Sequence, residues 1–229
     1  MDHALANLIA ASIAFVGTHF ALSHPLRAPL VARLGAAGFQ GLYSLVAFAT
    51  LGWMIFAFRA VGPGGAPLWN GSGDAVWIIA SLLTLVASVL LVGSLIGNPA
   101  LPIPTAAAKA AAAKGPHGVF HSTRHPMMWA FALWAVAHIL VSPTPRNLVL
   151  CGAVAFLALV GSHLQDRKKA AAMGADWHEW HARTNFGPRL GRLAWAGWVP
   201  WVGGLALWLA ASWAHLPLNG MVAGVWRWL

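Results

Sequence analysis

Six long stretches of this chain contain no Asp, Glu, Lys or Arg, and they constrain its fold more than any other feature. They cover His3–Leu26, Leu34–Phe58, Ala75–Ala108, His125–Pro145, Asn147–Gln165 and Leu193–Trp226, with lengths of 24, 25, 34, 21, 19 and 34 residues. A helix needs roughly 17–25 mostly apolar residues to cross the hydrocarbon core of a bilayer, so each stretch can hold one span. We therefore predict an all-α, polytopic membrane helix bundle of about six transmembrane helices.

The composition agrees with a membrane location and excludes several other classes of protein. Hydrophobic residues make up 59% of the chain and charged residues 8%, whereas about 25% of the residues in a soluble domain are charged. The single cysteine, Cys151, excludes an intrachain disulfide scaffold. The net charge of +9 comes from basic residues in the connections between the apolar stretches. We therefore expect the lipid bilayer as a partner and no nucleic acid, and we exclude a soluble enzyme and a disordered chain.

The basic residues are divided unequally between the two sides of the predicted bundle. The connections after the first, third and fifth spans contain 11 of the 14, namely Arg27, Arg33, Lys109, Lys114, Arg124, Arg167, Lys168, Lys169, Arg183, Arg189 and Arg192. The other side has only Arg59, Arg146 and Arg227. Because the cytoplasmic loops of membrane proteins are enriched in Lys and Arg, we predict that both termini lie away from the cytoplasm.

Prolines and glycines set the ends of the predicted spans, which cover residues 4–22, 39–58, 75–97, 126–141, 148–164 and 195–213. A short basic turn containing Gly35 and Gly38 is expected between the first two spans. We expect Ala106–Lys114 to form a short juxtamembrane helix, because alanine has the highest helix propensity. Residues 177–181 are predicted to be an amphipathic inner segment, and Met221–Leu229 an interfacial tail.

Three histidines, His19, His138 and His163, lie within the predicted spans, which contain no carboxylate. An ionisable side chain in the bilayer is costly and tends to face the interior of the bundle. One interpretation is structural, with each imidazole hydrogen-bonded to a neighbouring backbone carbonyl. The other is that His19 and His138, on different helices, hold a haem iron from its two axial sides.

Three further residues are candidates for binding such a cofactor. Arg27 and Arg124 are predicted at the inner membrane face, where a guanidinium can pair with haem propionates or anchor a loop to lipid headgroups. His125 follows Arg124 directly. The pairing of the two axial histidines is geometrically demanding, because His138 lies 12 residues beyond Pro126, about 18 Å along a helix. Helix tilt or a deep start of the fourth span must bring it level with His19.

Several motifs resemble the NnrU family of membrane proteins. They are the sequence GVFHSTRHP at Gly118–Pro126, followed by Met128-Trp129, Leu133-Trp134 and Ala137-His138, and near the N-terminus Gly17-Thr18-His19, Ser23–Arg27 and Gly41–Ser44. The resemblance covers nearly the whole chain to about Arg192. More distantly, the chain is similar to the plant zeta-carotene isomerases, which are membrane proteins carrying haem b.

The resemblance implies one NnrU-like membrane domain over residues 1–229, with a core of 3–192 and a last span and tail of 193–229. It implies a multi-pass location in the bacterial inner membrane. It also implies haem b with His19 and His138 as axial ligands, and His24 and His163 are the alternatives to His19. The family is linked to nitrite and nitric oxide reduction in bacteria and to carotenoid isomerisation in plastids. A hydrophobic small molecule or nitric oxide is therefore the expected ligand, and no catalytic residue is assigned.

The C-terminal half also resembles another group of membrane enzymes, the isoprenylcysteine and phospholipid methyltransferases. The similarity lies in Arg124-His125-Pro126, the following hairpin, and Gly174, Trp177 and Trp180. It implies a site for S-adenosylmethionine formed by Arg124, His125 and the region of Asp166. This chain has Met128 and Ala130 where those enzymes have Tyr and Gly, and Asp166-Arg167 where they have paired glutamates. A third hypothesis is a non-enzymatic assembly or transport factor whose intramembrane histidines only pack.

Overall fold

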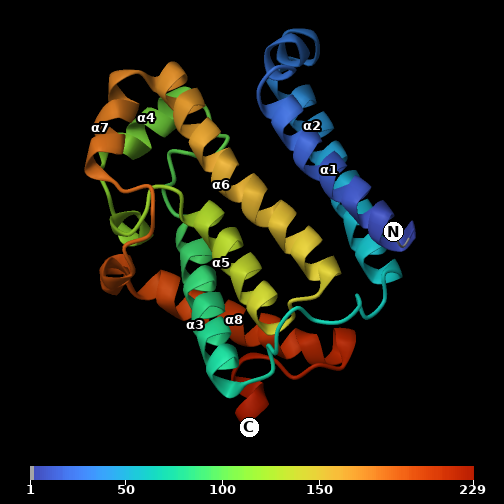
Figure 1. The fold of residues 1–229 in the computed structure, drawn as a ribbon. Coiled ribbons are helices and arrows are strands. Elements are labelled where there is room, and N and C mark those ends of the chain that lie inside the picture. The colour runs from blue at the N-terminus through green and yellow to red at the C-terminus, as the bar shows by residue number, and fades with distance from the viewer. Residues whose placement is uncertain (1–2) are drawn as a thin grey trace. The chain divides into compact units, whose positions relative to one another are not determined.

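The computed structural model describes residues 3–229, and all regular secondary structure in this part of the chain is helical. Five helices are long and apolar enough to cross a membrane: α1 (His3–Ser23), α2 (Arg27–Ala60), α3 (Asp74–Gly93), α6 (Pro145–Met173) and α8 (Trp198–Asn219). The prediction of a helical membrane bundle is therefore confirmed (Figure 1). The sixth predicted span is the apolar helix α5 (Pro126–Val141). Its 16 residues extend only about 24 Å, less than the thickness of a bilayer core.

The shorter elements lie in the connections. They are the helices α4 (Thr105–Ala113) and α7 (Ala175–Arg183) and the 3₁₀ helices η1 (Gly118–His121), η2 (Leu190–Ala196) and η3 (Gly224–Trp228). The juxtamembrane helix expected at Ala106–Lys114 and the amphipathic segment at residues 177–181 correspond to α4 and α7. The basic turn expected between the first two spans lies within the bounds of α2, as a break at Gly35 between two helical segments. Only Gly35 departs from helical geometry, with φ 70° and ψ 170°, a conformation that is essentially restricted to glycine.

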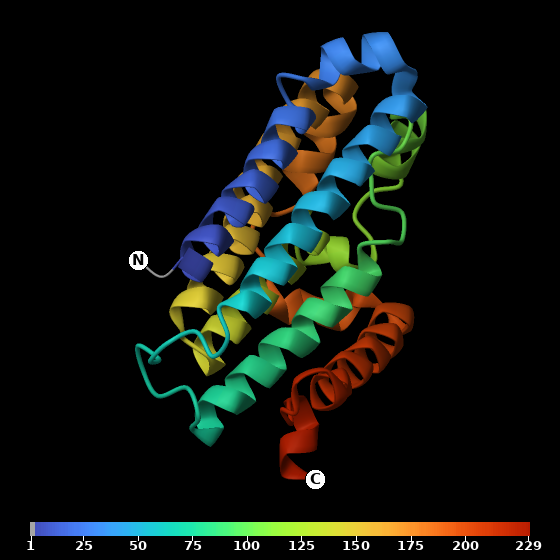
Figure 2. The ribbon, with the colours of Figure 1, turned by 90° about the vertical axis from the view of Figure 1, so that its right-hand side faces the viewer.

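The chain forms two compact units. The first comprises the residues up to Gly71 together with His138–Leu157. In it α1 and α2 pack side by side in both views of the ribbon (Figures 1 and 2). They are antiparallel, because Trp53 Nε1 donates to Asn7 Oδ1 over 3.1 Å at one end and Ser23 Oγ donates to the Tyr43 hydroxyl over 3.4 Å at the other.

The second unit comprises Ser72–Ala137 and Ala158–Leu229. Its helices α3 and α8 approach closely at Gly204, where an added Cβ would lie 2.6 Å from the Val89 Cα. Small residues at helix crossings are typical of membrane proteins. Beneath the connections lies an apolar core that includes Phe120, Trp177 and Trp180, each 1% exposed. This core gives the loops of the second unit a fixed shape, and the polar cluster described below lies on them.

Candidate functional site

The second unit contains a cluster of buried charged and ionisable side chains around Asp166 of α6. Arg124 donates to both oxygens of the Asp166 carboxylate, from Nε to Oδ2 over 2.9 Å and to Oδ1 over 3.1 Å, and from Nη2 to Oδ2 over 2.7 Å. His125 Nε2 lies 2.9 Å from Asp166 Oδ1. The side chains of Arg124, Asp166 and His125 are 7%, 14% and 0% exposed. Bidentate, buried pairs of this kind are among the strongest polar contacts in proteins.

The backbone around Arg124 is fixed by the segment that follows α7. Arg124 N donates to Asn185 O over 2.8 Å, Trp129 Nε1 donates to Phe186 O over 2.8 Å, and the Arg124 guanidinium lies 5.3 Å from the centre of the Phe186 ring. Because Pro126 cannot donate a backbone hydrogen bond, it starts α5 directly after His125. The local sequence thus places an Arg-His pair at a helix start, facing α6.

The tautomer of His125 follows from its partner. A carboxylate held by two guanidinium donors can only accept hydrogen bonds, so the proton shared with Asp166 belongs to His125 Nε2. The other ring nitrogen, Nδ1, is buried and has no hydrogen-bond partner among the described residues. In the neutral imidazole this nitrogen carries a lone pair. Buried polar atoms without a partner are uncommon in native proteins, and of the six in the described residues this one belongs to a residue that lines the cavity described next.

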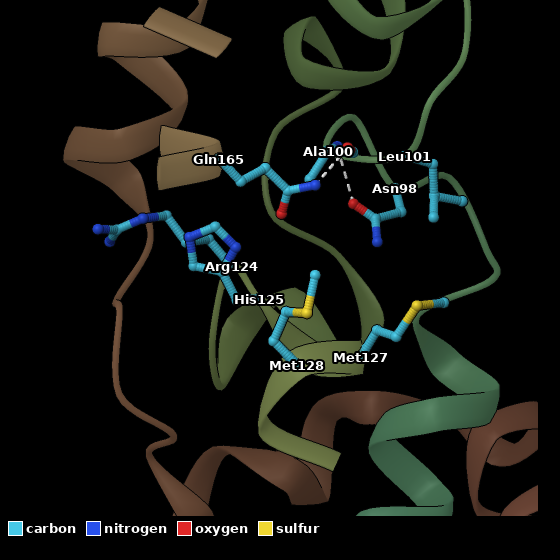
Figure 3. A pocket seen from close by; sticks show the side chains of 8 residues that line it. All are labelled: Asn98, Ala100, Leu101, Arg124, His125, Met127, Met128 and Gln165. Carbon is cyan, nitrogen blue, oxygen red and sulfur yellow. Dashed lines mark hydrogen bonds between the residues drawn. The ribbon is translucent and has the colours of Figure 1, made fainter. Parts of the chain in front are cut away.

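A small cavity of about 20 Å³ lies against His125. It has room for a single ion or water molecule. Figure 3 shows the His125 ring on one side of the cavity, with Gln165 and Asn98 above it and the two methionine side chains below. The lining residues are Asn98, Ala100, Leu101, Arg124, His125, Met127, Met128 and Gln165. Both amide side chains are tied to Ala100, since Gln165 Nε2 donates to its carbonyl over 2.9 Å and Asn98 Oδ1 accepts from its N–H over 2.9 Å.

A further histidine, His181 of α7, lies close enough to this cluster for the charges of Arg124 and Asp166 to affect its pKa. Burial and the positive charge of Arg124 lower the pKa of His181, while Asp166 opposes the shift. The residues 3–229 contain no group of three or more His, Cys, Asp and Glu side chains that could hold a metal ion. Any metal bound here would therefore need other ligand types.

The first predicted haem ligand, His19, belongs to the first unit. Its Nδ1 lies 2.7 Å from the carbonyl oxygen of Phe15, one turn earlier on α1. Since a carbonyl only accepts, Nδ1 carries the proton and the Nε2 lone pair is available for a ligand. Aromatic rings flank the imidazole, with the centres of the Phe15 and Tyr43 rings 4.4 and 5.6 Å away.

The second predicted ligand, His138, lies near the other end of the same unit. Trp69 Nε1 donates to Leu140 O, two residues past His138, over 3.1 Å. Trp69 belongs to the loop after α2, and that end of α2 packs against Asn7 at the start of α1. His19 is 12 residues farther along α1 than Asn7, or about 18 Å. The structure therefore does not bring His19 and His138 together on one iron atom.

The other predicted cofactor residues have separate surroundings. Arg27 is exposed at the start of α2, with its guanidinium 5.0 Å from the centre of the Phe39 ring. Arg124 is occupied by Asp166 and does not extend toward solvent as a propionate ligand would. His24 is half-buried at the end of α1 that carries His19, and His163 is exposed on α6 with its ring 5.7 Å from that of Phe186.

Comparisons with known proteins identify the family. The family model described as NnrU protein matches residues 7–223. The chain belongs to the NnrU family. No curated protein and no solved structure matches the chain. The family match covers all of α2 to α8, and the resemblance of the chain to the NnrU family is confirmed.

In this NnrU-family protein, the structure unites the residues named for the methyltransferase hypothesis, Arg124, His125 and Asp166, but not in a form that favours S-adenosylmethionine. All of the carboxylate's strong contacts are made within the protein, and the adjoining cavity has room for only one small group.

The sequence did not point to Asn98 or Gln165 as site residues. Their only available signal was the position of Gln165 directly before Asp166, the one acidic residue between Asp74 and Asp176.

Proposed function

We propose that this NnrU-family protein binds haem b within its membrane domain, with His19 as an axial ligand, and acts in nitrite or nitric oxide metabolism or in a redox-dependent, carotenoid-type isomerisation. The observation that carries the proposal is the hydrogen bond from His19 Nδ1 to the Phe15 carbonyl. Metal-bound histidines almost always donate their second ring nitrogen in this way, which fixes the tautomer and the ring orientation.

The surroundings of His19 support the same function. The helix α1 contains no Asp, Glu, Lys or Arg, and an ionisable imidazole within such a helix is costly unless it serves a purpose. Phe15 and Tyr43 supply flat apolar faces next to the ring, as a porphyrin would require. When bound, haem supplies one-electron redox chemistry and a position for a diatomic ligand. The role of the protein is to orient the Nε2 lone pair of His19 and to exclude water around it.

Two histidines, His138 and His24, are candidates for the second axial ligand. The resemblance to the isomerases assigns it to His138, whereas in the present arrangement His138 lies near the loop after α2, toward the Asn7 end of α1, and His19 lies toward the other end of that helix. His24 directly follows the C-terminal end of α1, the end nearer to His19. If neither His138 nor His24 binds, the iron keeps an open position, which is the state that nitric oxide or a substrate needs.

The experiment is absorption spectroscopy of the protein purified from haem-supplemented cells, in the oxidised state and after reduction with dithionite. We expect a Soret band that His19→Ala abolishes. The matched control is His215→Ala, because His215 Nδ1 makes the same type of hydrogen bond, to Ala211 O over 2.8 Å, on α8 of the other unit. Loss of the band in His215→Ala as well, or a wild-type protein without any Soret band, contradicts the proposal.

The same spectra decide the second ligand. Six-coordinate bis-histidine iron does not bind carbon monoxide until a ligand leaves, whereas iron held by His19 alone binds it directly. We expect His138→Ala to retain the Soret band and the wild-type reduced protein to bind carbon monoxide. A band that disappears in both His19→Ala and His138→Ala would instead support the bis-histidine pair and require a rearrangement of α5.

A further inference from the structure

We propose that the cavity next to His125 is a binding site for a single Cu(I) ion, with His125 Nδ1 and the thioether sulfurs of Met127 and Met128 as its ligands. The three side chains line the same cavity of about 20 Å³ in the second unit (Figure 3). The site is separate from His19, which belongs to the first unit. The inference therefore does not rest on the haem proposal.

The first step of the inference is the state of His125. Its side chain is fully buried, its Nε2–H is donated to Asp166, and its Nδ1 has no partner among the described residues. A histidine anchored through one nitrogen by a carboxylate, with its other nitrogen available to a ligand, is the usual arrangement of a metal-bound imidazole, and His125 lines the cavity. Arg124 holds the carboxylate in turn, so the imidazole plane is fixed before any ion arrives.

The second step is the type of atom that surrounds the cavity. Two thioether sulfurs and one imidazole nitrogen are soft or intermediate ligands, and thioethers select Cu(I). The lining contains no cysteine and no carboxylate that is not already paired, so Zn²⁺, Mg²⁺ and Ca²⁺ lack the ligands they prefer. A monovalent ion also suits the charge of the site, because the Arg124–Asp166 pair is neutral overall. The competing occupant is one water molecule, which the amides of Gln165 and Asn98 would also serve.

The third step is the geometry of the neighbouring chain. Met127 and Met128 are the second and third residues of α5, directly after Pro126, and both are half-buried. At the first turn of a helix the backbone N–H groups have no intrahelical partner. The thioether side chains are long and flexible, so they can adjust around an ion at low cost. The amide of Gln165 is tied to Ala100 on the opposite side and closes the cavity there.

The test is an anaerobic titration of the full-length, detergent-solubilised protein with Cu(I) in the presence of a chromophoric Cu(I) chelator, followed by metal analysis after desalting. We expect one copper per chain. The double substitution Met127→Leu with Met128→Leu, which nearly conserves volume and so leaves the fold intact, is expected to weaken Cu(I) binding by at least tenfold. The matched control is Met221→Leu in the exposed tail, which is expected to retain the wild-type affinity.

Two additional arms make the result decisive. His19→Ala must bind Cu(I) as the wild type does, so that loss of haem and loss of copper are distinguished. Zn(II) as the probe is expected to be lost on desalting. The proposal is overturned if the wild type retains no copper, which leaves water as the occupant, or if the double methionine variant retains full affinity. It is equally overturned if Met221→Leu loses copper to the same extent.

Discussion

The Arg124 guanidinium holds the Asp166 carboxylate from two of its nitrogens, across 42 residues of sequence, with less than a sixth of either side chain exposed. This ion pair joins the start of α5 to the C-terminal half of α6. It also positions His125 through the second carboxylate oxygen. Three side chains from two segments thus depend on one carboxylate.

Replacement of Asp166 by asparagine is expected to destabilise the protein strongly. Removal of one partner of a buried ion pair leaves the other charge uncompensated, at a cost of about 3–5 kcal/mol. The measurement is the thermal unfolding midpoint in detergent. Asp176→Asn is the matched control, because its pair with Lys109 is 44% exposed on both sides and should change stability by less than about 1 kcal/mol. Equal effects of the two substitutions would show that the Arg124 pair is energetically unimportant.

Substitution of Gly204 by alanine should separate α8 from α3. The added Cβ would lie 2.6 Å from the Val89 Cα and 2.8 Å from its backbone nitrogen, and backbone atoms cannot yield as a flexible side chain can. We expect a loss of about 1–3 kcal/mol, in line with other overpacked sites. Gly152→Ala, where nothing lies within 4 Å of the new methyl group, serves as the reference. A Gly204→Ala protein as stable as this reference would contradict the helix crossing.

Gly35→Ala is predicted to lower stability through backbone strain alone. The glycine has φ 70° and ψ 170° and no atom within 4 Å of an added Cβ, so only the backbone conformation opposes the substitution. The expected cost is about 1–3 kcal/mol. In Gly41→Ala, which is helical and equally uncrowded, the same change should be neutral or stabilising. Opposite signs for the two substitutions are the expected outcome, and a stabilising Gly35→Ala would show that α2 is continuous there.

Lys169→Met should loosen the loop between α3 and α4. Lys169 Nζ donates to Pro99 O over 2.7 Å and to Leu101 O over 2.9 Å, and the substitution leaves the buried Pro99 carbonyl and the partly buried Leu101 carbonyl without these donors. Hydrogen exchange of residues 98–104 should become faster while that of α3 stays unchanged. Lys114→Met, at an exposed position after α4, controls for the loss of a charge. Unchanged exchange in the loop would show that other contacts hold it.

The spans could be predicted from the sequence because 19 or more residues without a charged side chain are typical of a helix that crosses the hydrocarbon core of a bilayer. The break expected at Gly35 and Gly38 is found at Gly35, where two helical segments meet, because glycine adopts a positive φ at little cost. Gly38 keeps helical geometry. The helix α6 continues beyond residue 164, the expected end of its span, through Asp166 to Met173. It does so because the following Lys and Ala residues are good helix formers.

The candidate site was predictable only in part. The motif around Arg124, His125 and Asp166 indicated a group that the structure does unite. The cavity could not be foreseen, because the orientation of Gln165 and Asn98 depends on the backbone of Ala100, a tertiary relationship. The depth of His138 depends on where α5 ends relative to the loop after α2, which local sequence patterns do not specify.

The bend at Gly35 has a consequence for how the protein matches its bilayer. As a straight rod the 34 residues of α2 would extend about 51 Å, far beyond the hydrophobic thickness of a membrane. With the bend, the segment after Gly35 is about 37 Å long and can span with a moderate tilt. The preceding turns, which carry the exposed Arg27 and Arg33, are free to follow the headgroup layer. A single glycine thus decides how much of this helix belongs to lipid tails and how much to the interface.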